Sequence, residues 1–128
     1  MLQIIDPYCC AQEDARRRLV DFIARFDKAA DSIGKVHVVS FDADSLRDSY
    51  ESNEEQCGDI ERKVAAKLPN TNFHHAPRSR RGTGDLHDRR VTATFADGSR
   101  VIWDLGRGID GIMSPRFGCV VNATVEQS

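Results

Sequence analysis

Three consecutive residues, His87, Asp88 and Arg89, combine the side-chain types that phosphate chemistry uses. The pKa of histidine lies nearest neutrality, so His87 is a candidate nucleophile or general base. Arg89 lies two residues further on and projects to the same side of an extended chain, where both side chains would contact one phosphate. In the alternative interpretation, His87 is a structural residue at the start of a strand and is satisfied by Asp88 or by a backbone carbonyl.

Downstream residues extend this candidate site. Asp97 is the candidate orienting carboxylate, with Asp88 as the alternative. Gly106 and Gly108 flank Arg107, and two glycines let the backbone approach a ligand closely while the arginine supplies charge. The alternative interpretation of this Gly-Arg-Gly segment is an ordinary tight turn after a strand.

The net charge of −2 is unevenly distributed along the chain. Residues 1–77 hold ten Lys/Arg and fourteen Asp/Glu, whereas residues 78–116 hold eight Arg, no Lys and five Asp. Guanidinium groups match phosphate oxygens bidentately, so this stretch favours a phosphate-bearing ligand, although a solvated arginine surface is the alternative. The candidate phosphate-binding residues are Arg78, Arg80, Arg81, Arg89, Arg107 and Arg116.

Other patterns limit the class of protein. The N-terminus lacks the features of a secretion signal, and no stretch is long and apolar enough to span a bilayer. The four cysteines have no disulfide-framework pattern, so we expect reduced thiols in a cytoplasmic protein. His37, His74-His75 and Cys9-Cys10 show no zinc-ligand spacing, so no metal or other cofactor is expected.

The elements that must position the site follow from hydrophobic periodicity and turn residues. Apolar residues at three- and four-residue steps, from Leu19 to Ile33, predict a helix with Gly34 at its C-cap. Ser52 and Glu55 form a capping box for a second helix, which Pro69 ends. The predicted strands are residues 2–5, 35–41, 72–76, 90–95, 101–105 and 117–125, with a polar connection at 42–52, a basic loop at 77–84, a turn at 96–99 and a glycine-rich connection at 106–115.

This order predicts one α/β domain over residues 1–128. Its mixed β-sheet has helices packed on it and follows the order β-α-β-α-β, then a hairpin and a final strand. The nearly continuous apolar run at 35–41 is typical of a strand covered on both faces.

These motifs resemble the C-terminal phospholipase D-like domain of proteins with a microtubule-interacting-and-trafficking (MIT) domain. That domain carries His-Asp-Arg, then Asn/Asp-Gly, an aromatic residue and Gly-Arg-Gly-Leu-Asp, and its start is similar to Asp6-Pro7-Tyr8. The matching residues here are His87, Asp88, Arg89, Asp97, Gly98, Trp103, Gly106, Arg107, Gly108 and Asp110.

The resemblance implies a phospholipase D-like fold and a phosphate site. The wider superfamily uses His-x-Lys with a histidine phospho-enzyme intermediate, and pairs two motifs within one chain or across a homodimer. Here Arg89 stands in place of the lysine, and a single motif is present. We therefore expect a non-catalytic domain that binds acidic phospholipid (phosphoinositide) headgroups and is peripheral on membranes.

The alternative is a metal-independent phosphodiesterase, a nuclease or phospholipase active as a homodimer. Catalysis would then use His87 as nucleophile, Arg89 as phosphate clamp and Asp97 as orienting carboxylate. Nucleic-acid binding without cleavage stays open as well, because an arginine surface does not distinguish lipid phosphate from backbone phosphate.

Overall fold

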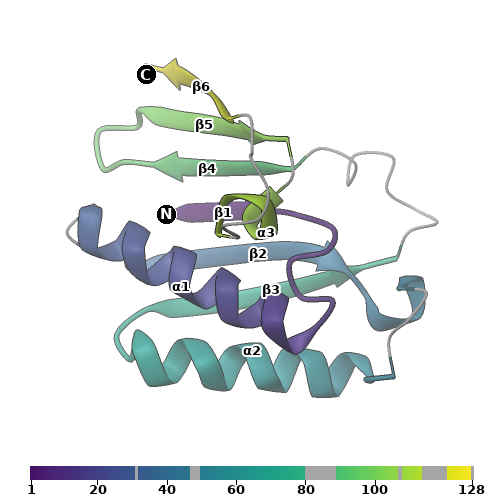
Figure 1. The fold of residues 1–128 in the computed structure, drawn as a ribbon. Coiled ribbons are helices and arrows are strands. Elements are labelled where there is room, and N and C mark those ends of the chain that lie inside the picture. The colour runs from purple at the N-terminus through teal and green to yellow at the C-terminus, as the bar shows by residue number, and fades with distance from the viewer. Residues whose placement is uncertain (31, 47–49, 80–88, 107, 114–120, 128) are drawn as a thin grey trace.

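A mixed six-stranded β-sheet runs through the protein, as a computed structural model shows (Figure 1). The structure describes residues 1–30, 32–46, 50–79, 89–106, 108–113 and 121–127. The strands follow the spatial order β3-β2-β1-β4-β5-β6. Their bounds are β1 Leu2–Ile5, β2 Lys35–Phe41, β3 Asn72–Arg78, β4 Arg90–Thr94, β5 Arg100–Leu105 and β6 Val121–Glu126.

The direction of the strands changes in the middle of the sheet. β1, β2 and β3 pair in parallel, whereas β4 is antiparallel to β1, and β5 and β6 continue antiparallel. The carboxyl ends of β1, β2, β3 and β5 therefore meet the start of β4 along one edge of the sheet, which we call the carboxyl edge. In open α/β sheets, ligands bind outside the carboxyl ends of the strands where the chain order changes direction.

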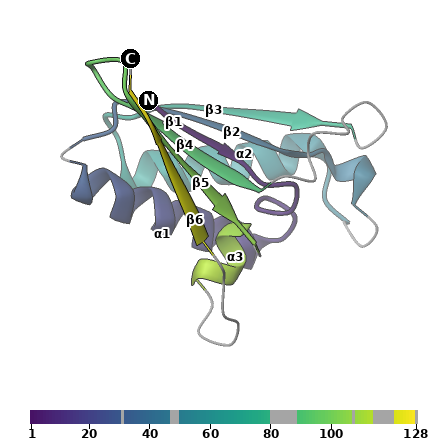
Figure 2. The same cartoon turned by 90° about the horizontal axis from the view of Figure 1, so that it is seen from above.

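Three α-helices lie on one face of the sheet (Figure 2). Within the described residues they are α1 Glu13–Ala29, α2 Asn53–Lys67 and the short α3 Gly108–Met113, and a 3-10 turn, η1 Ala43–Ser45, follows β2. The amphipathic pattern of α1 buries Leu19, Val20 and Ile23 against the sheet. Ser52 caps α2, because its hydroxyl accepts a hydrogen bond of 3.1 Å from the Glu55 N–H.

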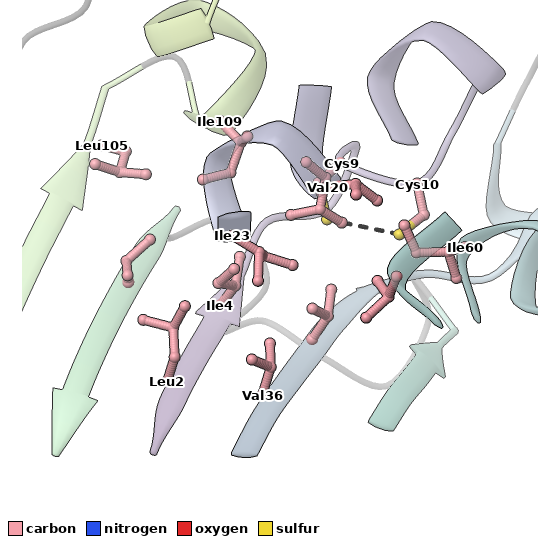
Figure 3. Packing of buried hydrophobic residues seen from close by; sticks show 14 of the residues in the cluster. Leu2, Ile4, Cys9, Cys10, Val20, Ile23, Val36, Ile60, Leu105 and Ile109 are labelled. Carbon is pink, nitrogen blue, oxygen red and sulfur yellow. Dashed lines mark hydrogen bonds between the residues drawn. The ribbon is translucent and has the colours of Figure 1, made fainter. Parts of the chain in front are cut away.

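The core lies between this face of the sheet and the helices (Figure 3). Leu2 and Ile4 of β1 pair in register with Val36 and Val38 of β2, and all four side chains are fully buried. Successive residues of a strand point to opposite faces, so this register puts alternate apolar residues of each strand under the helices. Burial of this kind supplies most of the stability of the fold.

The predicted order of elements and the mixed sheet are confirmed, with local differences. His37 and Val39 of β2 are partly exposed, because the α-helices cover a single face, so the prediction of a strand covered on both faces was wrong. α1 ends at Ala29 with Ala30 as its C-cap, before Gly34. β3 extends beyond the predicted residue 76 to Arg78, and α3 lies in the segment predicted as a connection. β6 spans Val121–Glu126, and residues 117–120 of the predicted strand lie outside the described residues.

Candidate functional site

The loop after β1 forms the centre of the carboxyl edge. Its Asp6 N–H donates to the Val39 carbonyl at 3.0 Å, and its Pro7 carbonyl accepts from the Phe41 N–H at 3.0 Å. These two hydrogen bonds continue the β1–β2 pairing past the end of β1 and hold the loop against β2. The loop therefore presents its side chains from a fixed backbone.

The Asp6 carboxylate joins this loop to the start of α3. It is 3% exposed. One oxygen, Oδ1, accepts from the Tyr8 N–H at 3.1 Å, and Oδ2 accepts from the Ile109 N–H at 2.8 Å. Hydrogen bonds to a charged acceptor are stronger than neutral ones, so a carboxylate at the end of β1 anchors a turn more than one hundred residues away in sequence.

Gly108 makes this anchoring possible. Its φ of +67° lies in the left-handed region, and an added Cβ would lie 2.2 Å from Asp6 Oδ2 and 3.0 Å from Arg89 Cδ. Any other residue would displace the carboxylate or the arginine stem. The motif residue Gly108 thus has a packing role in bringing Asp6 and Arg89 together.

Arg89 lies directly before β4 at the same edge. Its guanidinium carbon is 5.5 Å from the centre of the Tyr8 ring, a cation–π contact. The Tyr8 and Phe41 rings are perpendicular, with their centres 5.6 Å apart, and the Arg89 carbonyl accepts from the Leu105 N–H at 2.8 Å. These contacts therefore hold both the backbone and the guanidinium group of Arg89 in place.

Two further predicted residues share the carboxyl edge. Arg78 is the exposed last residue of β3, and Gly106 is exposed directly after β5. Arg78 and Arg89 are separated by three strand spacings, or about 14 Å at about 4.8 Å per strand. The two arginines therefore lie along one edge, three strands apart.

Asp97 and Gly98 lie at the opposite end of the sheet. They form the turn between β4 and β5, where Gly98 has φ +86° and the Ser99 N–H donates to the Asp97 carboxylate at 2.9 Å. The five residues of β4 separate this turn from Arg89 by about 17 Å. The structure does not bring Asp97 to the carboxyl edge, so the expected neighbourhood of Asp97 and Arg89 is not found.

Trp103 packs against a helix of the core. Its ring meets Phe26 of α1 edge to face at 5.6 Å, on the helix-covered side of β5.

Several predicted residues lie outside the described part of the chain, namely Arg80, Arg81, His87, Asp88, Arg107 and Arg116, together with the side chain of Asp110.

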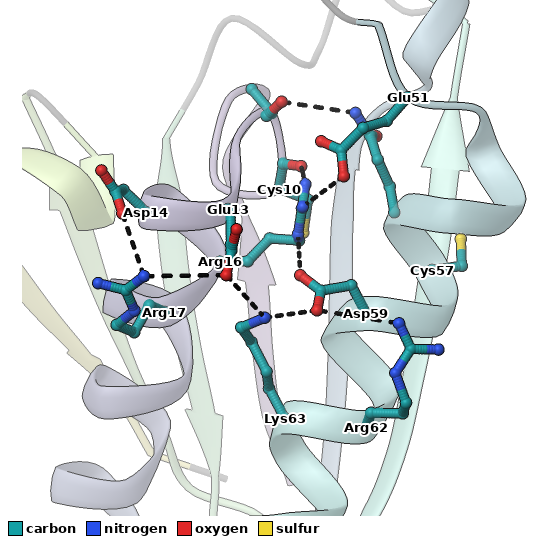
Figure 4. A network of polar contacts seen from close by, with 12 residues as sticks. Cys10, Glu13, Asp14, Arg16, Arg17, Glu51, Cys57, Asp59, Arg62 and Lys63 are labelled. Carbon is teal, nitrogen blue, oxygen red and sulfur yellow. Dashed lines mark hydrogen bonds and ion pairs between the residues drawn. The ribbon is translucent and has the colours of Figure 1, made fainter.

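A second polar network lies between α1 and α2, at the carboxyl-edge end of the molecule (Figure 4). The buried Arg16 donates to Glu51 at 2.7 Å, to Asp59 at 2.6 Å and to the Cys10 carbonyl at 2.9 Å. A hollow of about 570 Å³ opens beside it. Five carboxylates line this hollow, those of Glu13, Glu51, Glu54, Glu55 and Asp59. Arg16 and Arg62 also line the hollow, but the carboxylates outnumber them, so its charge repels phosphate.

Sequence reasoning missed the anchoring role of Asp6 and the stacking role of Tyr8. The available signal was their place directly after an apolar strand, where side chains reach the carboxyl edge. Within the described ranges, the structure contains no group of three or more His, Cys, Asp or Glu residues arranged to hold a metal ion.

Comparison of the chain with protein-family models, curated proteins and solved structures gave no match. The architecture itself is that of an α/β domain with a six-stranded mixed sheet. Among the residues described here, no helix has the length and apolar character needed to cross a membrane.

Proposed function

We propose that the carboxyl edge around Arg89 binds the phosphate of acidic phospholipid headgroups, with phosphoinositides as the first choice, in a non-catalytic, phospholipase D-like manner. The observation that carries this proposal is the placement of Arg89 over the Tyr8 ring, beside the loop that Asp6 anchors. Arg89 is the one arginine of the resembling motif that the described residues include together with its contacts.

The contacts of Arg89 leave its charge available to an anion. Among the described residues it forms no ion pair, and its guanidinium stacks on an aromatic ring. Its neighbour Arg90 differs, since Arg90 pairs with Asp104 at 3.4 Å. A stacked guanidinium keeps its in-plane N–H groups free to bind two phosphate oxygens.

Exposed tyrosines favour a membrane surface as the source of the phosphate. Tyr8, beside Arg89, is 44% exposed, and Tyr50, between η1 and α2, is 100% exposed. Tyrosine is favoured at membrane interfaces because its ring enters the apolar boundary while its hydroxyl stays hydrated. Arginine and tyrosine side by side fit a headgroup better than they fit a free phosphate in water.

The charge around the carboxyl edge favours binding through a specific headgroup contact rather than through general attraction to an anionic surface. The acidic hollow beside Arg16 lies at the same end, and the net charge of the chain is −2. A general attraction to an anionic surface is therefore weak, because polybasic segments supply such attraction. Binding should depend on the headgroup that Arg89 and its neighbours contact.

Vesicle sedimentation tests this proposal. Phosphatidylcholine vesicles containing a phosphoinositide should retain the protein at low salt, vesicles of phosphatidylcholine alone should not, and retention should fall as salt rises. Absence of retention at low salt would contradict the proposal.

An enzymatic assay covers the alternative function. The phosphodiesterase interpretation depends on His87, and the described histidines, His37, His74 and His75, lie in β2 and β3 rather than beside Arg89. We expect no hydrolysis of a generic phosphodiester or of nucleic acid. Hydrolysis that persists in EDTA and is lost in His87→Ala would replace the non-catalytic part of the proposal.

A further inference from the structure

A buried cluster of thiols, a hydroxyl and an imidazole lies between α2 and the sheet. His75 of β3 is 7% exposed. Its Nε2 lies 2.7 Å from the Ser40 hydroxyl of β2, and its Nδ1 lies 3.1 Å from the Cys57 thiol of α2. The cluster brings together side chains from β2, α2 and β3, and it is separate from the proposed phosphate site.

The two ring nitrogens of His75 have different partners. Nε2 contacts the Ser40 hydroxyl, and Nδ1 contacts the Cys57 thiol. With the ring proton on Nε2, the Ser40 oxygen accepts from Nε2–H and Nδ1 accepts from the Cys57 S–H. A thiol, a base in contact with it and a third group that orients the base form the arrangement of an activated nucleophile.

Exposure distinguishes Cys57 from the other two described thiols. Cys9 and Cys10 are fully buried with their sulfurs 3.8 Å apart (Figure 3), whereas Cys57 is partly exposed on α2 (Figure 4). Reagents in solution therefore reach Cys57 before they reach Cys9 or Cys10. Burial, followed by the charges of Cys10 and Glu61, raises the pKa of Cys57, so this thiol needs the adjacent base to ionise.

Cys10 provides a second thiol next to the same imidazole. The hydrogen bond from the Cys9 thiol lowers the pKa of Cys10 to about 6, against the opposing effect of burial and with help from His75 and Ser40. These interactions favour the ionised form of the Cys10 thiol, which lies close to the cluster. It is shielded from solvent by its complete burial.

We propose that Cys57 is a thiol–disulfide exchange site, which low-molecular-weight disulfides modify with His75 as the proton acceptor. His75 Nδ1 takes the thiol proton, and the Cys57 sulfur attacks one sulfur of the disulfide RSSR. The S–S bond of the reagent breaks and a mixed disulfide forms on Cys57. The departing RS⁻ takes the proton back from His75 and leaves as RSH.

Cys10, which also interacts with His75, is positioned to resolve this mixed disulfide. His75 takes the Cys10 thiol proton and the Cys10 sulfur attacks the Cys57 sulfur, which forms a disulfide between the two cysteines. The second RS⁻ is released, takes the proton from His75 and leaves as RSH. Overall, two protein thiols are oxidised and RSSR is reduced to two RSH. This activity is independent of phosphate binding at Arg89.

The charges around Cys57 guide the choice of probe. Glu54 and Glu61 lie three and four residues from Cys57 on α2 and share its side of the helix. An anionic disulfide would be repelled, so the test uses the neutral bis(2-hydroxyethyl) disulfide. The intact protein is incubated with the probe at neutral pH, remaining thiols are alkylated, and non-reduced peptides are mapped by mass spectrometry over time.

Among Cys9, Cys10 and Cys57, we expect Cys57 to be modified first, either as the probe adduct or as the Cys10–Cys57 disulfide that follows from it. The adduct on Cys57 supports the proposal. The disulfide supports it when Cys10 stays unmodified in Cys57→Ser, because Cys57 is then the thiol that reacts first. Cys57→Ser should remove both products. His75→Gln should slow modification of Cys57 by about tenfold or more, because a positioned base contributes at least that much.

Ser40→Ala provides a second test if His75→Gln folds poorly. It keeps the imidazole and removes the hydroxyl that orients it, so modification should slow by a smaller factor. Circular dichroism checks the fold of each variant. Unmodified Cys57 in the native protein, a probe adduct confined to other cysteines, or equal rates in the wild type and both folded variants would overturn the proposal.

Discussion

Replacing Gly108 by alanine should destabilise the protein through the contact between α3 and the loop after β1. The new Cβ would lie 2.2 Å from Asp6 Oδ2 and 2.9 Å from Asp6 Cγ, at a φ of +67°. A left-handed alanine costs about 1 kcal/mol. Displacing the carboxylate also breaks its hydrogen bond to the Ile109 N–H, which contributes about 2 kcal/mol because the acceptor is charged. The expected loss in the free energy of unfolding is therefore about 3 kcal/mol.

Gly34→Ala is the matched control. Gly34 has a similar φ of +74°, but nothing lies within 4 Å of its added Cβ. This control should lose about 1 kcal/mol, from backbone strain alone. Urea unfolding measures the free energy of unfolding of both variants. A difference of about 2 kcal/mol between them corresponds to a difference of about 1 M in the urea midpoint. Equal losses in the two variants would refute the role of Gly108 in holding Asp6.

Two further predictions concern the helices. Burial opposes the ionisation of Asp59, but Lys63 and Arg16 outweigh it and lower the pKa of this carboxyl below its ordinary value of 3.8. A lowered pKa contributes stability above the unfolded pKa that is lost as pH falls through the folded pKa. Asp59→Asn should therefore cost more at pH 6 than at pH 3 in urea unfolding, and an equal cost at both would contradict the ion pairs. Ser52→Ala removes the hydroxyl that accepts from the Glu55 N–H and should cost about 1 kcal/mol, whereas an unchanged midpoint would show that the cap contributes nothing.

Local signals predicted most of the secondary structure. The apolar stripe of α1, the Ser52 cap of α2 and the turn at Gly98 all depend on residues close together in sequence, and each is present in the structure. α3 was not predicted because a six-residue helix rich in glycine has little intrinsic helical preference. Its start is held by Asp6, and no local pattern reveals a partner so distant in the chain.

The site was predicted less completely for the same reason. Sequence proximity grouped Asp97 with Arg89, although β4 separates them by its full length. Tyr8 lies beside Arg89 because β1 and β4 pair antiparallel, which only the sheet topology shows. His75, Ser40 and Cys57 come from three elements and carry no motif in the sequence.

The central claim is that Arg89 contacts the phosphate, and a comparison with its neighbour tests it most directly. Arg89→Gln and Arg90→Gln remove the same charge from adjacent positions, but only Arg90 pairs with Asp104. Binding to phosphoinositide-containing vesicles at low salt should weaken about fivefold in Arg89→Gln, which corresponds to about 1 kcal/mol for one arginine at a membrane surface. Arg90→Gln should bind within about twofold of the wild type, because its charge is already offset by Asp104. Equal weakening in the two variants, or none in Arg89→Gln, would contradict the proposed site.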